Sequence, residues 1–153
     1  MAILYMMIGI PGSGKSTVAE RLLEKKYGAY VVSTDTLRHE LLGNADDQSQ
    51  NGKIHAEARN RVLYALRAGK DACHDATNIK AEHRAQLLNE MPENTITVGV
   101  LCECEIPTAL RRQLGRDRRV PEHVIRRMAW QLEIPTLQEF NAVMHISETV
   151  VLP

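Results

Sequence analysis

The stretch GIPGSGKS at residues 9–16 decides the fold of this chain. It has the spacing G-x-x-x-x-G-K-[ST], comes directly after the apolar run at residues 2–8, and opens a helical pattern at residues 15–26. In this context the glycines let the backbone curl so that its N–H groups point at phosphate oxygens, and the helix N-terminus adds partial positive charge. The stretch therefore predicts a phosphate-binding loop for a nucleoside triphosphate, most often ATP.

The side chains of this loop have separate expected roles. Lys15 is expected to reach the β- and γ-phosphates, and the hydroxyl of Ser16 is expected to bind Mg²⁺. ATP and Mg²⁺ are thus the predicted ligands, while the acceptor stays open. The predicted nucleotide-binding residues of the loop are Gly12, Ser13, Gly14, Lys15, Ser16 and Thr17.

Outward from the loop, short apolar runs alternate with longer helical patterns. Strands are predicted at residues 2–8, 30–33, 71–77 and 95–102, with a last one within 142–152. Helices are predicted at residues 15–26, 35–42, 54–68, 81–91, 107–114 and 121–132. The polar stretch 44–53 is expected to be a loop.

This alternation predicts an α/β fold of the P-loop NTPase and nucleotide-kinase type. The expected architecture is a three-layer sandwich with a central, mostly parallel sheet, in one domain spanning residues 1–153. In such sheets the site lies at the carboxyl ends of the strands.

Composition narrows the function classes. The chain has 153 residues, 44% of them apolar and 25% charged, which fits a globular protein rather than a disordered one. Lys plus Arg equals Asp plus Glu at 19 each, so a strongly basic nucleic-acid coat is excluded, although a local basic patch is not. Aromatic residues are only 4%, which disfavours a stacking platform for single strands.

The cysteines and the N-terminus point to a cytoplasmic protein. Three cysteines are too few, and odd in number, for a disulfide framework, which fits a reducing compartment. The N-terminal apolar run is too short to cross a membrane and lacks a basic segment before it, so no membrane association is expected. Cys102 and Cys104 are interpreted as small strand residues rather than a metal pair, and no histidine spacing predicts a metal site.

Polar residues that follow two of the predicted strands are candidates for the acceptor site. Asp35 can take a proton from an attacking hydroxyl, and Arg38 lies on the same helix face, three residues on. The alternative for Asp35 is a helix N-cap, and both remain open. Asp75 and Asn78 suit either an acceptor site, where Asp75 orients a water on Mg²⁺ or braces Arg38, or a plain turn.

Arginines are concentrated between residues 111 and 127. A lid over residues 111–121 would use them to stabilise the charge on a transferring phosphoryl group. The alternative is a solvated basic face, which is the expected state of Arg126 and Arg127. The candidates for the lid are Arg112, Arg116, Arg118 and Arg119, with Arg116 and Arg118 as alternatives for one position.

Together these residues resemble the kinase module of 5′-hydroxyl polynucleotide kinases of the phage and bacterial end-healing type. The resemblance covers about residues 3–135 in order and spacing. It rests on the loop at 9–17, the runs STDTLR at 33–38 and DATN at 75–78, Arg84, and the lid from Arg112 to Pro121 with Ile125 and Met128. It implies ATP-dependent transfer of the γ-phosphate to a 5′-OH end of RNA or DNA.

The resemblance also implies roles for single residues. Asp35 is implied as the general base, and Arg38 as the group that binds the 3′-phosphate of the acceptor. Asp75, with Asn78, is implied in the acceptor site, and Arg116 and Arg112 on the donor phosphates. Formation of a homo-oligomer stays open.

Two other function classes remain. A small-molecule kinase acting on a sugar, antibiotic, nucleoside or aminoacyl group shares most of these features, and zero net charge favours it. A nucleotide-dependent ATPase switch is the third class, although Asp35 and an arginine lid suit an alcohol acceptor better than water.

Overall fold

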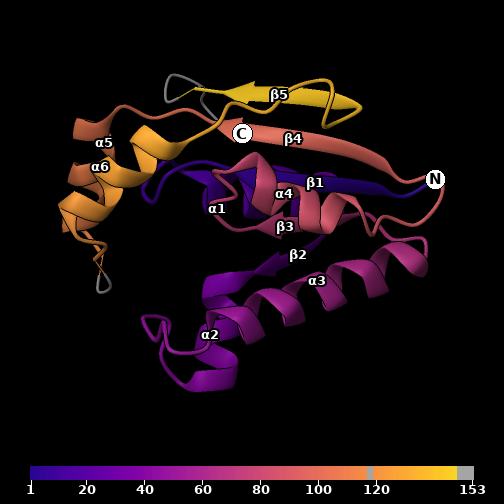
Figure 1. The fold of residues 1–153 in the computed structure, drawn as a ribbon, viewed down its shortest axis with the longest axis horizontal. Coiled ribbons are helices and arrows are strands. Elements are labelled where there is room, and N and C mark those ends of the chain that lie inside the picture. The colour runs from indigo at the N-terminus through magenta and orange to yellow at the C-terminus, as the bar shows by residue number, and fades with distance from the viewer. Residues whose placement is uncertain (117–118, 148–153) are drawn as a thin grey trace.

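The computed structural model describes residues 1–116 and 119–147. Its sheet has five strands in the order β2-β3-β1-β4-β5, and every neighbouring pair is parallel (Figure 1). The strands are β1 (Ile3–Ile8), β2 (Tyr30–Ser33), β3 (Ala72–Asp75), β4 (Ile96–Cys102) and β5 (Ala142–Ile146). The predicted parallel sheet is thereby confirmed.

Helices connect the strands and cover both faces of the sheet. They are α1 (Lys15–Val18), η1 (Ala19–Glu24), α2 (Thr34–Leu42), α3 (Asn51–Arg67), α4 (Ala81–Leu88), α5 (Ile106–Leu114) and α6 (Glu122–Gln131). The side chains of β1 alternate between two apolar cores: Leu4 and Met6 pack with residues of α3, whereas Tyr5 and Met7 pack with residues of α1 and η1. The molecule is therefore the three-layer sandwich that the sequence predicts.

The topology gathers several loops at one edge of the sheet. Because β1 lies between β3 and β4, the loop after β1 stands where the strand order reverses, which is where ligands bind in open α/β sheets. The backbone N–H of Gly9 donates to the carbonyl of Thr77 at 3.0 Å, which ties the loop after β1 to the loop after β3. Helices α5 and α6 lie together at this edge of the sheet (Figure 1).

Three predicted elements differ most from the structure. The helix predicted at 15–26 changes after Val18 into the π-helical turn η1, in which Lys25 N–H donates to Glu20 C=O. Helix α3 begins at Asn51, so the expected loop through residue 53 is too long by three residues. Helix α4 ends at Leu88 rather than at 91, because its chain tightens into i→i+3 hydrogen bonds at Glu90 and Met91.

Other expectations concern the ends of elements and the membrane. Strand β5 confirms the predicted last strand as far as residue 146, and residues 148–152 of that prediction lie outside the described residues. Among the described residues, none of the helices combines the length and apolar character needed to cross a bilayer.

Candidate active site

The phosphate-binding loop at residues 9–16 connects β1 to α1, as predicted. Gly12 and Gly14 have φ angles of 85° and 88°, a left-handed conformation that favours glycine. Gly12 also lies against α5, and a Cβ placed on it would stand 2.8 Å from the carbonyl oxygen of Ala109. Both glycines are therefore required by the backbone itself.

Gly12→Ala is expected to weaken nucleotide binding at least tenfold, because the loop must shift to relieve the contact with Ala109 and its N–H groups then leave their phosphate-binding positions. Isothermal titration of ATP into the variant measures this loss. Gly28→Ala is the matched control, since Gly28 also has a positive φ of 74° but, among the residues that the structure describes, has no neighbour within 4 Å of an added Cβ. Equal affinity in Gly12→Ala and wild type would contradict the expectation.

Lys15 lies at the start of α1 and faces the loop. Its Nζ donates to the carbonyl of Ile10 at 3.4 Å. Burial lowers the pKa of Lys15, while the negative charges of Asp75 and Asp35 oppose this effect. A partly desolvated ammonium of this kind gains most from a nearby anion, which fits its predicted position on the β- and γ-phosphates.

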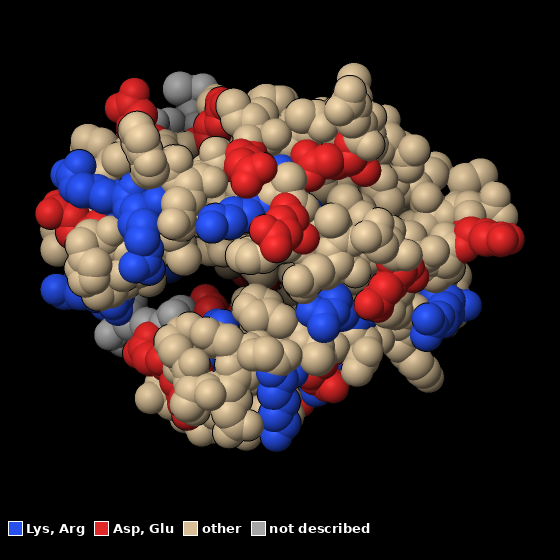
Figure 2. Space-filling view, in the orientation of Figure 1, with Lys and Arg blue, Asp and Glu red and all other residues tan. Residues whose placement is uncertain are grey.

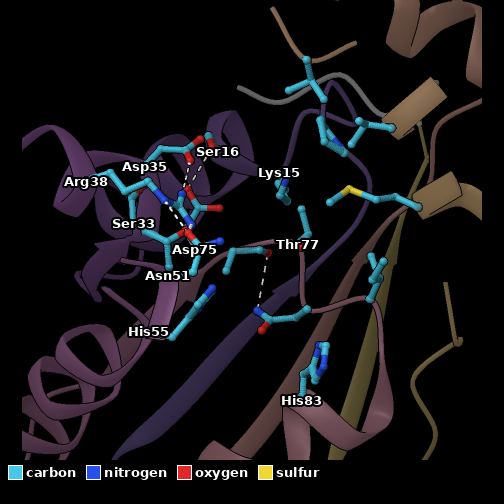
Figure 3. A pocket seen from close by; sticks show the side chains of 18 of the residues that line it. Lys15, Ser16, Ser33, Asp35, Arg38, Asn51, His55, Asp75, Thr77 and His83 are labelled. Atoms are coloured by element: carbon cyan, nitrogen blue, oxygen red, sulfur yellow. Dashed lines mark hydrogen bonds and ion pairs between the residues drawn. The ribbon is translucent and has the colours of Figure 1, made fainter. Parts of the chain in front are cut away.

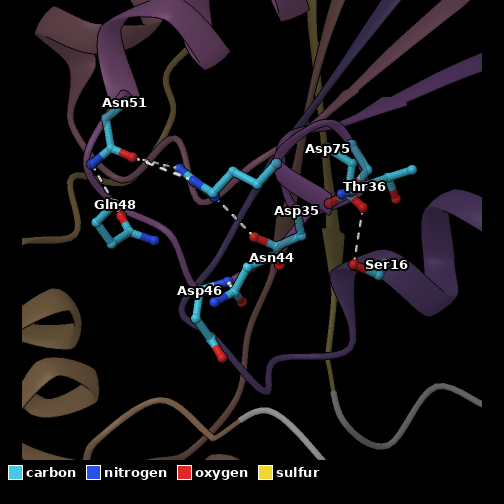
Figure 4. Close-up of polar contacts among 10 residues, drawn as sticks. Ser16, Asp35, Thr36, Asn44, Asp46, Gln48, Asn51 and Asp75 are labelled. Atoms are coloured by element: carbon cyan, nitrogen blue, oxygen red, sulfur yellow. Dashed lines mark hydrogen bonds and ion pairs between the residues drawn. The ribbon is translucent and has the colours of Figure 1, made fainter. Parts of the chain in front are cut away.

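Asp75 and Ser16 form the second part of the site. The Ser16 hydroxyl donates to Asp75 Oδ2 at 2.9 Å, and Asp75 is buried at the end of β3 (Figure 4). Burial raises the pKa of Asp75, and the charge of Lys15 and the bond from Ser16 oppose this. The sequence leaves two roles open for Asp75, next to Mg²⁺ or as a brace for Arg38. The observed hydrogen bond joins Asp75 to Ser16 and not to Arg38.

Ser16 and Asp75 suit Mg²⁺ chemically. A hydroxyl and a carboxylate are hard oxygen ligands, and Mg²⁺ on a nucleotide commonly keeps waters and needs only one or two protein groups. Within the described residues, none of the histidine, cysteine and acidic side chains form a group of three that could hold a metal ion. The donor set therefore fits a nucleotide-carried Mg²⁺ rather than a protein cage.

Asp35 and Arg38 lie across the cavity from the loop, both on α2 (Figure 3). The N-cap of α2 is Ser33, whose Oγ accepts from the N–H of Thr36 at 3.3 Å, so Asp35 is not the cap. Asp35 Oδ1 lies 3.1 Å from Arg38 Nη1. The Asp35 side chain is half exposed and lines the cavity, whereas Arg38 is buried.

Asn51 holds the other side of the Arg38 guanidinium (Figure 4). Its Oδ1 accepts from Nε at 3.3 Å and from Nη2 at 3.1 Å, and its own amide donates to Gln48 Oε1 at 3.0 Å. These bonds and the one to Asp35 use three of the five guanidinium N–H groups and leave two for a ligand. Sequence analysis missed Asn51 because it placed this residue in a loop, and only its place at the start of α3 reveals the contact.

Asn78 has a role within the chain. It adopts the left-handed region with φ 46°, and its Nδ2 donates to the carbonyl of Met7 at 2.8 Å. The amide thus joins the turn after β3 to the end of β1. Asn78 lines the cavity as predicted, but its amide nitrogen is used to hold this turn.

The arginines between residues 111 and 127 differ in their surroundings. Arg112 Nη1 donates to the carbonyl of Gly12 at 2.9 Å and so supports the phosphate loop. Arg116 and Arg119 line the cavity, as does Arg127, which was expected to be simply solvated. Arg126 is exposed, and its Nη2 lies 3.6 Å from Glu122 Oε1. Arg118 lies outside the described residues.

Most of these groups border one cavity of about 1000 Å³, whereas Arg112 and Arg126 do not line it. The phosphate loop and α2 line one part of it, α3 and α4 a second, and α6 with the segment before it a third. In the space-filling view the surface is hollowed between α2 and the α5–α6 region, and Lys and Arg side chains gather along the α5–α6 rim (Figure 2). The cavity is large enough for a nucleotide donor beside a second substrate.

The fold and the site define this chain as a P-loop kinase domain, which supports phosphoryl transfer from a bound nucleotide. It belongs to the AAA domain family AAA_33, which matches residues 4–135.

Solved structures share this fold. A gluconokinase from Sinorhizobium meliloti 1021 superposes with a TM-score of 0.67 at 17% identity, over 98% of this chain and 83% of that chain. A chain of the Pnkp1/Rnl/Hen1 RNA repair complex gives 0.76 at 20% identity, over 86% and 44% of the two chains. A fungal RNA kinase gives 0.69 at 14% identity, over 96% and 39%. This chain spans less than half of the last two, and at these identities the likeness shows the fold alone.

Proposed function

We propose that this protein is an ATP-dependent polynucleotide 5′-hydroxyl kinase, which transfers the γ-phosphate of ATP to 5′-OH ends of RNA or DNA. The observation that carries the proposal is the Asp35–Arg38 pair. A half-exposed carboxylate lies beside a buried arginine that has two N–H groups left for a ligand. One group suits a hydroxyl and the other suits a phosphate, and the 5′-terminal nucleotide of a strand carries both.

In this mechanism Asp35 accepts the proton of the 5′-hydroxyl as its oxygen attacks the γ-phosphorus. The bond from the γ-phosphorus to the bridging oxygen breaks, and ADP leaves with that oxygen. Lys15 and the N–H groups of the loop hold the β- and γ-phosphates in line with the hydroxyl. Ser16, with Asp75 beside it, would hold Mg²⁺, and the ion would supply positive charge next to the phosphates.

The arginines of residues 111–121 complete the proposed site. Arg116 lines the cavity and is assigned to the transferring phosphoryl group. Arg112 acts through the loop instead, because its Nη1 bonds the carbonyl of Gly12. This segment serves as a lid that excludes water and so limits hydrolysis of ATP.

The second candidate is a small-molecule kinase, whose acceptor hydroxyl would occupy the same place beside Asp35. The structural match to a gluconokinase, which spans 98% of this chain and 83% of that enzyme, favours this candidate. Zero net charge favours it as well. In both candidates Asp35 is the base, so they differ in the acceptor and not in the chemistry.

A transfer assay with γ-labelled ATP and Mg²⁺ separates these candidates. Oligonucleotides of RNA and DNA with a 5′-OH are the acceptors, and the same strands with a 5′-phosphate are the matched controls. Label on the 5′-OH strands alone supports the proposal and gives the preference for RNA or DNA. No label on any strand, with ATP binding intact, refutes it, and ADP release in a metabolite screen would then identify a small acceptor.

A further inference from the structure

A group of basic side chains in the cavity has no part in the proposed mechanism. His55 and Arg59 lie four residues apart on α3 and so share one helix face, while His83 comes from α4. All three line the cavity on the acceptor side, and His55 and His83 approach it from different helices (Figure 3). We call these three residues the α3–α4 cluster.

Arg59 gives the α3–α4 cluster a permanent positive charge, and the two histidines add hydrogen-bonding nitrogens. Burial lowers the pKa of His55, and the positive charges of Arg38 and Arg59 lower it further. Within residues 1–116 and 119–147, no carboxylate forms an ion pair with Arg59 or His83. A guanidinium without a carboxylate partner, flanked by two imidazole rings that can each donate a hydrogen bond, favours an anionic ligand there.

A buried histidine next to the cluster gives an independent indication of a ligand. His74 on β3 is 5% exposed and lines the same cavity. Its Nδ1 lies 3.1 Å from Asn78 Nδ2, and this nitrogen also donates to the carbonyl of Met7. A carbonyl oxygen can only accept, so the Asn78 atom between them is the NH₂ group and His74 Nδ1 must accept as well.

The proton of His74 is therefore on Nε2. Nε2 is buried and has no hydrogen-bond partner within residues 1–116 and 119–147. A buried N–H without an acceptor is costly, so this edge of the cavity would gain from an added acceptor, either an ordered water or a ligand oxygen.

We propose that His55, Arg59 and His83 form a second anion subsite, which binds the phosphodiester that follows the first phosphate of the acceptor strand. This inference rests on the proposed polynucleotide kinase function. Arg38 binds the phosphate nearest the reacting hydroxyl, and the α3–α4 cluster binds the next one. Two anion sites in series would let the enzyme prefer a strand over a single nucleotide.

The test compares two 5′-OH acceptors that differ by one phosphate, a dinucleoside monophosphate and the same dinucleotide with an added 3′-phosphate. The second phosphate is expected to lower KM about tenfold in the wild type, which is the scale of one charge-assisted hydrogen bond. In Arg59→Ala and in His83→Ala this advantage should fall to about twofold or less. Equilibrium titration of the 5′-deoxy forms, which cannot react, should show the same loss in affinity.

Arg67→Ala is the matched control, since Arg67 is an exposed arginine of the same helix outside the cavity. Equal KM values for the two acceptors in the wild type would overturn the second subsite and leave the kinase function standing. A tenfold advantage that persists in both Arg59→Ala and His83→Ala would also overturn it. If the wild type labels neither acceptor nor any longer strand, the proposed function fails and the subsite fails with it.

Discussion

Asp35→Ala is expected to lower kcat by about 10²–10⁴-fold, the usual contribution of a positioned general base. Asp35 lines the cavity, and Ser33 supplies the N-cap of α2, so the folded helix does not depend on the Asp35 side chain for that cap. Affinity for ATP should stay near that of the wild type, because the loop at residues 9–16 is unchanged. The measurement is steady-state transfer to a 5′-OH strand together with ATP titration.

A second variant separates the proposed role of Asp35 as a base from its contact with Arg38. Asp35→Ala also removes a partner of Arg38 at 3.1 Å, so part of its effect is expected on the KM of the acceptor. Asp35→Asn keeps an oxygen for Arg38 but cannot take a proton, so it should lower kcat with a smaller change in KM. Glu93→Ala, an exposed acid in the turn before β4, is the control for loss of charge. A kcat within tenfold of wild type in Asp35→Asn would exclude Asp35 as the base.

Arg84→Ala is expected to lower the free energy of unfolding by about 3–5 kcal/mol, the cost of removing one partner from a buried ion pair. Arg84 is fully buried, and its Nε lies 2.8 Å from Glu139 Oε1. Its Nη1 donates to the carbonyls of Asn78 and Glu133, both at 2.9 Å. One guanidinium therefore joins α4, the turn after β3 and the segment between α6 and β5.

The pH dependence of stability provides a further check on Arg84. Burial alone would raise the pKa of Glu139, but the hydrogen bonds and charge of Arg84 outweigh this and hold the pKa below its ordinary value of 4.5. A depressed folded-state pKa stabilises the protein above the ordinary value, and this contribution is lost as the pH falls through the folded value. Urea unfolding from pH 7 to pH 3 should show this loss in the wild type. Persistence of the full loss in Arg84→Ala would contradict the assignment.

The loop, the sheet and the order of the site residues could be predicted because each depends on local sequence. The run at residues 2–8 is apolar throughout, which is typical of a strand covered on both faces, and the glycine pattern that follows has a fixed spacing. Strand β2 has the predicted bounds, because YVVS follows a glycine turn and its own serine caps the next helix. Local patterns of this kind do not depend on distant contacts.

The missed features depend on contacts between distant segments. Asn51 accepts a hydrogen bond from Arg38, which lies 13 positions earlier in the sequence. The polar residues around Asn51 predict a loop, although α3 begins at Asn51. From the sequence, Arg84 is named only as one residue of the family resemblance. Its partner in the buried ion pair, Glu139, lies 55 positions further along the chain. These contacts cannot be predicted from the spacing of residues or from the composition.

The three cysteines of the chain differ in a way that matters for labelling chemistry. Cys73 and Cys102 are buried, and burial raises the pKa of both thiols, that of Cys102 to about 12. Thiolates react with alkylating reagents and thiols do not, so these two positions resist modification. Cys104 is only half-buried, and its sulfur lies 3.7 Å from the carbonyl of Gly12. A fluorophore or spin label on native Cys104 would therefore report on the phosphate loop without any engineered cysteine.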